Sequence, residues 1–190
     1  MSQAWKSFEL RCAKKLSLWL TDGACDNALV RTPVSGGWPT KHAAGDITAN
    51  DDVDVPEKER QCAKAFSRLF VVECKRRKGV NGGWTLEQLV TAKKHPIIEW
   101  WKETTELANR LACKRMMIIT KGVRGKPFVV FGDDEMRFLK KHIIPSEEGS
   151  EYTYPAHVLF SLPWLNEKLW AFSFNDFLKQ TSWIFPRERA

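Results

Sequence analysis

The strongest limit on the fold of this chain is an apolar run that ends in alternating charges, FVVECKRRKG at residues 70–79. Consecutive apolar residues bounded by polar segments are typical of a strand buried on both faces, and they predict a central strand over residues 68–75. Because side chains alternate between the faces of a strand, Glu73 and Lys75 share one face and Cys74 points the other way, into the core. Among the 23 acidic residues, only Glu73 has a lysine two positions later, which marks this pair for a functional role.

Hydrophobic periodicity and turn residues predict helices and strands on both sides of this segment. Helices are expected at residues 4–20, from 54–57 onward, at 85–94, from Pro96 onward, at 133–142 and at 175–180. The other strands are expected at residues 28–32, 45–49, 115–120, 127–131, 157–162 and 168–174. The helix from Pro96 has a stripe at helical spacing made of Ile97, Trp101, Thr104, Ala108 and Leu111. This order predicts an α/β fold, a single domain over residues 1–190 with a mixed central sheet flanked by helices.

Composition limits the class of protein. The chain has 190 residues, of which 43% are hydrophobic, so one domain can bury a core. No apolar run approaches the roughly 20 residues that a spanning helix needs, and the amphipathic N-terminal segment is expected to be a helix and not a signal peptide. We therefore expect no membrane contact and a cytoplasmic protein, in a bacterial or phage-infected cell. Five cysteines without zinc-ligand spacing are expected to be free thiols, and the net charge of +7 favours a nucleic-acid partner.

Asp46 is the carboxylate expected to join Glu73, because it is the one acid in the strand predicted at residues 45–49. Pairing of that strand with the central strand would bring the two carboxylates together. Two carboxylates beside a lysine suit a hard divalent cation, Mg²⁺ or Mn²⁺ as a substitute. Such a cation can activate a water for attack on phosphorus, while Lys75 orients that water or stabilises the pentavalent state. The basic residues expected to guide a nucleic-acid backbone are Arg76, Arg77 and Lys78.

The motif GD at residues 45–46, followed after an insertion by VVECK at 71–75, resembles the PD-(D/E)XK nuclease superfamily. The usual core of that superfamily is a helix, a hairpin that carries an Asp, a strand that carries (D/E)xK and a further helix. The similarity in element order spans residues 5–131, a restriction-endonuclease-like core. Residues 132–190 are then a C-terminal extension whose role the resemblance does not explain.

The resemblance implies roles for individual residues. Asp46, Glu73 and the main-chain carbonyl of Cys74 would hold Mg²⁺, with Lys75 as the catalytic lysine. A glutamate in the first helix recurs in the Holliday-junction-resolvase branch, and Glu9 fits that position. The alternative for Glu9 is an ordinary exposed helix glutamate.

The segment RTPVSGGW at residues 31–38 is similar to small phage-encoded members of the superfamily. By that similarity, Arg31 and Ser35 would contact phosphate. Gln88 lies where some branches carry a helix glutamine, and it is a further candidate for nucleic-acid binding. The alternative for Arg31 and for Gln88 is an ordinary surface residue.

The chain also departs from the superfamily pattern. Gly45 stands where a proline is common, and the distance from Asp46 to Glu73 requires an insertion at residues 50–67. The acids that compete with Asp46 as ligands lie in a polar, solvated run and are Asp51, Asp52 and Asp54. Asp46 is preferred because it lies in a strand with apolar flanks.

The expected function is therefore a Mg²⁺-dependent DNA endonuclease that hydrolyses phosphodiester bonds. A branched-DNA resolvase is a narrower interpretation, and it would be a homodimer because two symmetric cuts need two sites. The alternatives are a non-catalytic nucleic-acid-binding or interaction module on the same fold, and a sequence-specific restriction endonuclease.

Overall fold

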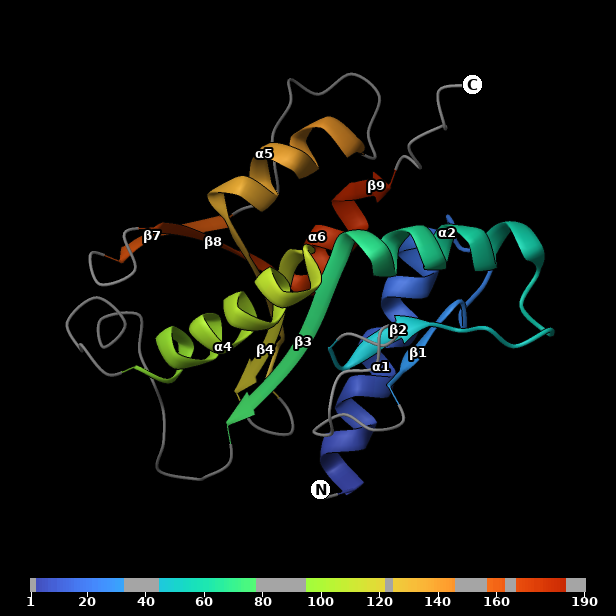
Figure 1. Ribbon diagram of the computed structural model, residues 1–190, viewed down its shortest axis with the longest axis horizontal. Helices are drawn as coiled ribbons and strands as arrows, with labels where there is room; N and C mark the ends of the chain where they lie inside the picture. Colours follow the sequence, from blue (N-terminus) through green and yellow to red (C-terminus); the bar gives the residue numbers. More distant parts are fainter. Residues whose placement is uncertain are drawn as a thin grey trace.

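The computed structural model describes residues 3–32, 45–77, 95–121, 125–145, 157–162 and 167–183. Its helices are α1 (Gln3–Leu20), α2 (Glu57–Leu69), α4 (Pro96–Leu111), α5 (Asp133–His142) and α6 (Phe174–Gln180). Its strands are β1 (Leu29–Arg31), β2 (Ile47–Ala49), β3 (Phe70–Arg77), β4 (Lys114–Lys121), β5 (Phe128–Gly132), β6 (Ile143–Pro145), β7 (His157–Leu162), β8 (Glu167–Ser173) and β9 (Thr181–Trp183). Figure 1 shows their arrangement. The helix predicted at residues 85–94 lies outside the described residues.

Five strands form one mixed sheet in the order β3-β4-β5-β8-β7. β3 and β4 run parallel, with Glu73 opposite Met117 and Lys75 opposite Ile119. The pairs β4–β5, β5–β8 and β7–β8 are antiparallel. The α/β class and the mixed sheet flanked by helices are therefore confirmed.

β3 differs from its prediction in two respects. It is an edge strand of the five-stranded sheet, although Val71 and Val72 are fully buried. It also begins two residues later than predicted, because α2 continues to Leu69 and joins β3 without a loop. The amide of Phe70 still donates to the carbonyl of Phe66, which completes the last helical turn. The apolar run therefore predicted that β3 is a buried strand. Its position in the sheet and its first residue depended on neighbouring elements.

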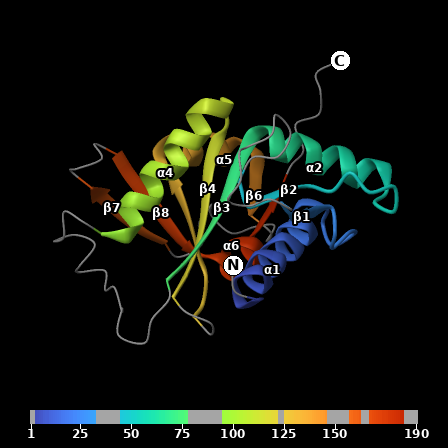
Figure 2. The same cartoon turned by 60° about the horizontal axis from the view of Figure 1, so that its bottom comes forward.

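Two apolar cores lie on opposite faces of the sheet. Met117 and Ile119 of β4 face the smaller core under α4, while Met116 and Ile118 face the larger core. Residues of α1, α2, α5 and α6 build the larger core. Figure 2 shows α4 on one side of the sheet and α1 on the other. Glu73 and Lys75, which have the same parity as Val71, lie on the α4 face.

The sequence around α4 explains its limits. Pro96 opens the helix, and the side chain of His95 accepts a hydrogen bond from the amide of Ile97 at 3.2 Å. Ala112 ends it in the left-handed conformation, with φ of 52°. Four members of the predicted stripe are buried and Leu111 is half-buried. The stripe therefore fixes which side of α4 lies on the sheet.

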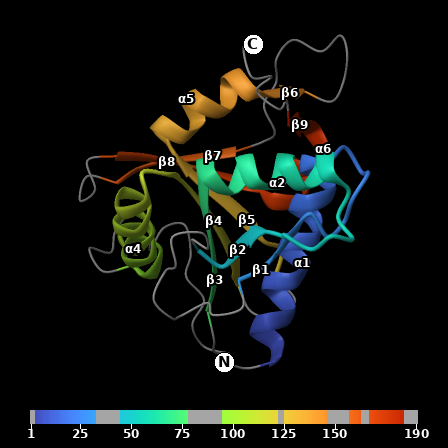
Figure 3. The same ribbon diagram turned by 45° about the vertical axis from the view of Figure 1, so that its right-hand side comes forward.

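The hairpin of β1 and β2 lies beside β3, as Figure 3 shows. Its strands pair antiparallel, with Val30 opposite Thr48. Gly45, just before β2, forms a parallel bridge with Val72 of β3. This bridge places the hairpin along the outer edge of β3, next to Glu73.

The C-terminal part contributes to the same sheet. β7 has the predicted bounds, and β8 lies between β7 and β5. Phe174, predicted as the end of a strand, is instead the first residue of α6. β6 and β9, which pair with each other, were not predicted, because strands of three residues are too short to show a periodicity.

All five cysteines are free thiols, as expected, and Cys12, Cys25 and Cys74 are buried. None of the helices within the described ranges combines the length and the hydrophobicity that crossing a bilayer needs.

Candidate active site

Two hydrogen bonds hold Asp46 at the edge of β3, and a third joins it to the residue that follows β1. Its amide donates to the carbonyl of Val72 at 2.8 Å, and its own carbonyl accepts from the amide of Thr32 at 2.9 Å. Its Oδ2 accepts from the amide of Cys74 at 2.8 Å. The carboxylate is therefore held beside the residue that separates Glu73 from Lys75.

Gly45 explains why this site lacks the proline that is common in the superfamily. Its φ is +80°, which proline cannot adopt, and a Cβ there would lie 2.5 Å from the carbonyl oxygen of Val72. Only glycine allows the chain to approach β3 this closely and still point Asp46 at Cys74.

The main chain of Cys74 faces the same edge. In an extended strand the N–H and C=O of one residue leave on the same side. Because its N–H points at Asp46, its carbonyl is directed toward this edge as well. The Cys74 side chain is buried in the larger core, as predicted.

Glu73 and Lys75 form an ion pair, with Nζ 3.0 Å from Glu73 Oε2. Their side chains are only 13% and 18% exposed, so water screens the pair weakly. A second carboxylate, Glu103 of α4, approaches Nζ to 3.2 Å. Glu103 was not predicted from the sequence. One sequence feature could have indicated it: Glu103 lies beside the apolar stripe of α4, three residues after Trp100 and four before Leu107.

Glu9 is fully buried, so its alternative as an exposed helix glutamate is wrong. Its Oε2 accepts a hydrogen bond from Nε of Arg31, which joins α1 to β1. Glu9 also raises the pKa of Asp46, so the two carboxylates are electrostatically coupled. Arg31 therefore contacts a carboxylate of the site, and its expected contact with phosphate stays a prediction.

Burial and like charge shape the protonation of the site. Burial, reinforced by Glu9, raises the pKa of Asp46 to about 6, despite the opposing hydrogen bond from Cys74. Burial raises the pKa of Glu73 as well, and Asp46 adds to the effect. Burial alone would lower the pKa of Lys75, but Glu73 and Glu103 together raise it above its ordinary value. The site therefore holds a protonated lysine and carboxylates whose mutual repulsion a cation would relieve.

The donor set fits a hard divalent cation. Asp46 and Glu73 supply carboxylate oxygens, and Cys74 supplies a carbonyl. Within the described ranges, no three His, Cys, Asp or Glu side chains gather as a metal-binding group. Mg²⁺ ordinarily takes one or two protein carboxylates and keeps several waters, so these donors are sufficient.

Of the other residues predicted to bind nucleic acid, the structure describes only the side chain of Arg76. Arg76 is half-buried on the opposite face of β3 from Lys75. Arg77 ends β3, and its side chain is not described. Ser35, Lys78 and Gln88 lie outside the described residues. The competing acids Asp51, Asp52 and Asp54 are exposed, whereas Asp46 is half-buried.

Comparison with known protein families gives a match over most of the chain. The sequence profile of a family described as "Phage putative PDDEXK endonuclease" matches residues 6–145, which is well over half of the chain. The matched range includes Glu9, Asp46, Glu73 and Lys75. No match to a curated protein or to a solved structure was found. The chain therefore belongs to this family of phage PDDEXK endonucleases.

Proposed function

We propose that this chain is a metal-dependent DNA endonuclease that hydrolyses phosphodiester bonds at the Asp46–Glu73–Lys75 site. The observation that carries the proposal is that two carboxylates, Asp46 and Glu73, lie together although they are 27 positions apart in the chain. The mostly buried side chain of Lys75 lies beside them. Burial raises the pKa of both carboxyl groups, Glu9 adds to the effect at Asp46, and Asp46 adds to it at Glu73. Such a site is costly to maintain without a cation, and functional sites are where such costs occur.

Each residue has a distinct role in this proposal. Asp46, Glu73 and the Cys74 carbonyl would hold Mg²⁺, or Mn²⁺ as a substitute. When bound, the cation would activate water for attack on phosphorus and stabilise the charge on the phosphate. Glu9 would act through Arg31 and Asp46, because its carboxylate contacts the first and repels the second.

Lys75 is better suited to act as a cation than as a general base. Its ion pairs with two carboxylates raise its pKa, so the amine stays protonated at neutral pH. A protonated lysine can donate hydrogen bonds that orient the attacking water. It can also stabilise the negative charge of the pentavalent phosphorus.

DNA is the substrate that the charge of the protein favours, with 30 basic against 23 acidic residues. Arg76 adds a positive charge to the same strand as Lys75, although its half-buried side chain lies on the other face of β3. The buried Glu9 is what favours the narrower function of a branched-DNA resolvase, acting as a homodimer inside a bacterial or phage-infected cell.

The test compares the wild type with Lys75→Ala on a four-way junction, a linear duplex and single-stranded DNA, each with Mg²⁺, Mn²⁺ or EDTA. Lys58→Ala, which removes an exposed lysine of α2, is the matched control. We expect metal-dependent cutting by the wild type and the control, and at least about a hundredfold loss in Lys75→Ala.

The products distinguish the narrower functions. Selective cutting of the junction supports a resolvase, and discrete fragments from a long DNA support a restriction endonuclease. A wild type that binds DNA but cuts none of these substrates with either metal contradicts the proposal and favours a non-catalytic binding module.

A further inference from the structure

The ammonium of Lys75 lies between two carboxylates from different elements. Glu73 Oε2, on the same strand, is 3.0 Å from Nζ, and Glu103 Oε2, on α4, is 3.2 Å from it. Glu103 is 62% exposed, whereas Lys75 is 18% exposed. The shielded partner, Glu73, is also the residue proposed to hold the cation.

Glu73 cannot both bind a cation and hold the ammonium of Lys75 equally well. A carboxylate that binds a divalent cation shares its negative charge with that cation, which weakens its attraction for an ammonium. The cation also repels the ammonium directly. Lys75 therefore needs an anchor that does not itself bind the metal, or it would move out of the site when the cation enters.

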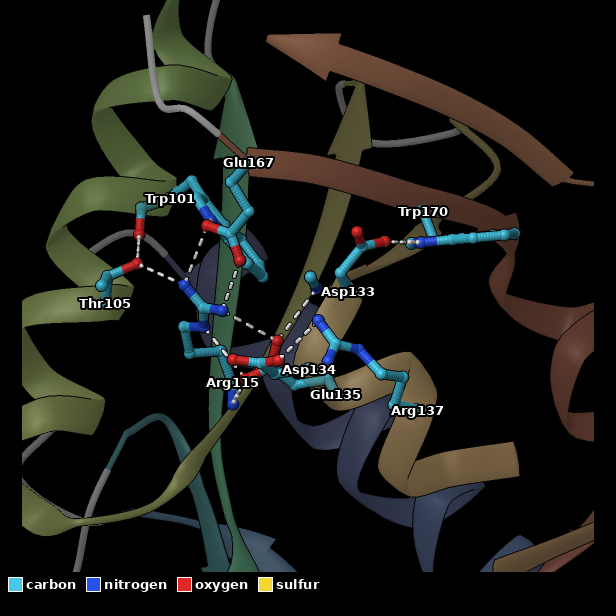
Figure 4. Close-up of polar contacts among 10 residues, drawn as sticks. Trp101, Thr105, Arg115, Asp133, Asp134, Glu135, Arg137, Glu167 and Trp170 are labelled. Carbon is cyan, nitrogen blue, oxygen red and sulfur yellow. Dashed lines mark hydrogen bonds and ion pairs between the residues drawn. The ribbon is translucent and has the colours of Figure 1, made fainter. Parts of the chain in front are cut away.

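Glu103 can be that anchor because α4 is fixed to the sheet on its other flank. Thr105, two residues further along α4, accepts a hydrogen bond from Arg115 of β4 at 3.1 Å. Nε1 of Trp101 donates to Glu167 of β8 at 2.9 Å. Figure 4 shows these contacts among Trp101, Thr105, Arg115 and Glu167.

The buried apolar stripe of α4 also fixes the helix on the sheet. Residues two positions apart on a helix differ by about 200° in direction, so Glu103 projects from the opposite flank to Thr105, toward β3. The backbone of Glu103 is thus set by the buried side of α4 and by the network on its far flank. Its carboxylate can stay in place when Glu73 changes partner.

We propose that Glu103 is a positioning residue that keeps the ammonium of Lys75 directed at the reacting phosphate once Glu73 holds a cation. The inference rests on the proposed endonuclease function. It assigns Glu103 neither to the metal nor to the DNA. The two competing roles are a third metal ligand and a surface ion pair without consequence, which exposed pairs often are.

The activity test uses Glu103→Gln and the matched control Glu106→Gln, an exposed glutamate of the same helix, one turn further on. We expect the single-turnover rate of Glu103→Gln at saturating DNA and Mg²⁺ to fall about tenfold. KM for DNA and the half-saturating Mg²⁺ concentration should change less than twofold. Glu103→Asp should recover part of the rate, and Glu106→Gln should match the wild type.

Two measurements without turnover separate the roles. Calorimetry with Mg²⁺ alone should give the same affinity for the wild type and Glu103→Gln within twofold, whereas a metal ligand would lose fivefold or more. A crystal structure of the wild type with Ca²⁺ should keep Nζ of Lys75 within hydrogen-bond distance of Glu103. In Glu103→Gln with Ca²⁺, the Lys75 side chain should leave that position.

These experiments distinguish failure of the Glu103 role from failure of the endonuclease function. A wild type that neither binds Mg²⁺ nor cuts DNA overturns the endonuclease itself. An active wild type with Glu103→Gln equal to Glu106→Gln in rate overturns only the role of Glu103, as does a Lys75 that abandons Glu103 in the Ca²⁺ structure.

Discussion

Gly45 and Asp46 fix the candidate site through backbone conformation. The positive φ of Gly45 turns the chain so that Asp46 meets β3 at Val72 and Cys74. The sequence alone shows a departure from the superfamily pattern at this position. The structure supplies the reason, because proline would have neither the required φ nor the room.

Gly45→Ala should destabilise the protein by about 2–4 kcal/mol, because it combines left-handed strain with a clash against the carbonyl of Val72. Gly23→Ala is the matched control, since Gly23 has φ of +82° but a Cβ added there would meet nothing within 4 Å. That change should cost about 1 kcal/mol. Urea unfolding of both variants measures the difference, and equal losses would mean that the close approach to Val72 does not matter.

Asp46→Asn should stabilise the metal-free protein at pH 7.5 by about 1–3 kcal/mol while abolishing cleavage. The carboxyl pKa is about 6 in the folded protein against 3.8 for an unperturbed aspartate, so folding penalises the charged form. The wild type takes up a proton as pH falls through 6 and regains this stability. The advantage of the variant should therefore shrink between pH 6 and pH 4.

Unfolding in EDTA at pH 7.5 and pH 4.5 checks this dependence. Asp54→Asn, an exposed acid, serves as the control and should change stability little at either pH. A stability gain for Asp46→Asn that is the same at both values would contradict the role of the Asp46 carboxylate.

At the scale of elements, α4 connects the candidate site to a second polar cluster. Arg115 of β4 bonds Glu135 of α5 and Glu167 of β8, and Thr105 of α4 completes the group, as seen in Figure 4. The guanidinium is 12% exposed and Glu135 is 4% exposed. This cluster lets one arginine set the mutual positions of four elements.

Arg115→Ala should destabilise the protein by about 3–5 kcal/mol, because it leaves Glu135 buried without its cation. Arg137→Ala is the control. It removes an exposed ion pair with Asp134, which contributes at most about 0.5 kcal/mol. Thermal and urea unfolding give the comparison, and a loss below about 1 kcal/mol for Arg115→Ala would show that the cluster is not structurally important.

At the scale of the whole molecule, the C-terminal strands belong to the sheet that carries the site. β8 pairs with β5 on one side and β7 on the other. Leu169 faces the core under α4, while Phe172 lies in the larger core. The family match ends at residue 145, before these strands. That residues 5–131 form the nuclease core and residues 132–190 an extension stays a prediction. The sheet itself continues past residue 132, because β7 and β8 belong to it.

A chain that ends at residue 145 should not fold cooperatively. It would expose the edge of β5 and remove buried residues from both cores, including Phe174 and Phe177 of α6. We expect the full chain to melt in one sharp transition by circular dichroism and the shortened chain to show none. A cooperative transition in the shortened chain would place the folding unit within residues 1–145.

Patterns along the chain were enough to predict many of the helices and strands and part of the site. The buried run at residues 70–72 predicted β3, and alternation predicted that Glu73 and Lys75 share a face. The stripe of α4 predicted which side of that helix is buried. These features follow from neighbours along the chain, which is why periodicity reveals them.

The contacts between side chains that are distant in the sequence depend on how the elements pack. Glu9 with Arg31, Asp46 with Cys74, and Lys75 with Glu103 are pairs separated by 22 to 28 positions. No periodicity encodes such pairs, because each depends on how the hairpin and α4 dock on β3. The edge position of β3 likewise depends on which other strands pair with it. It is this docking that buries Glu9 and adds Glu103 to the lysine of the site.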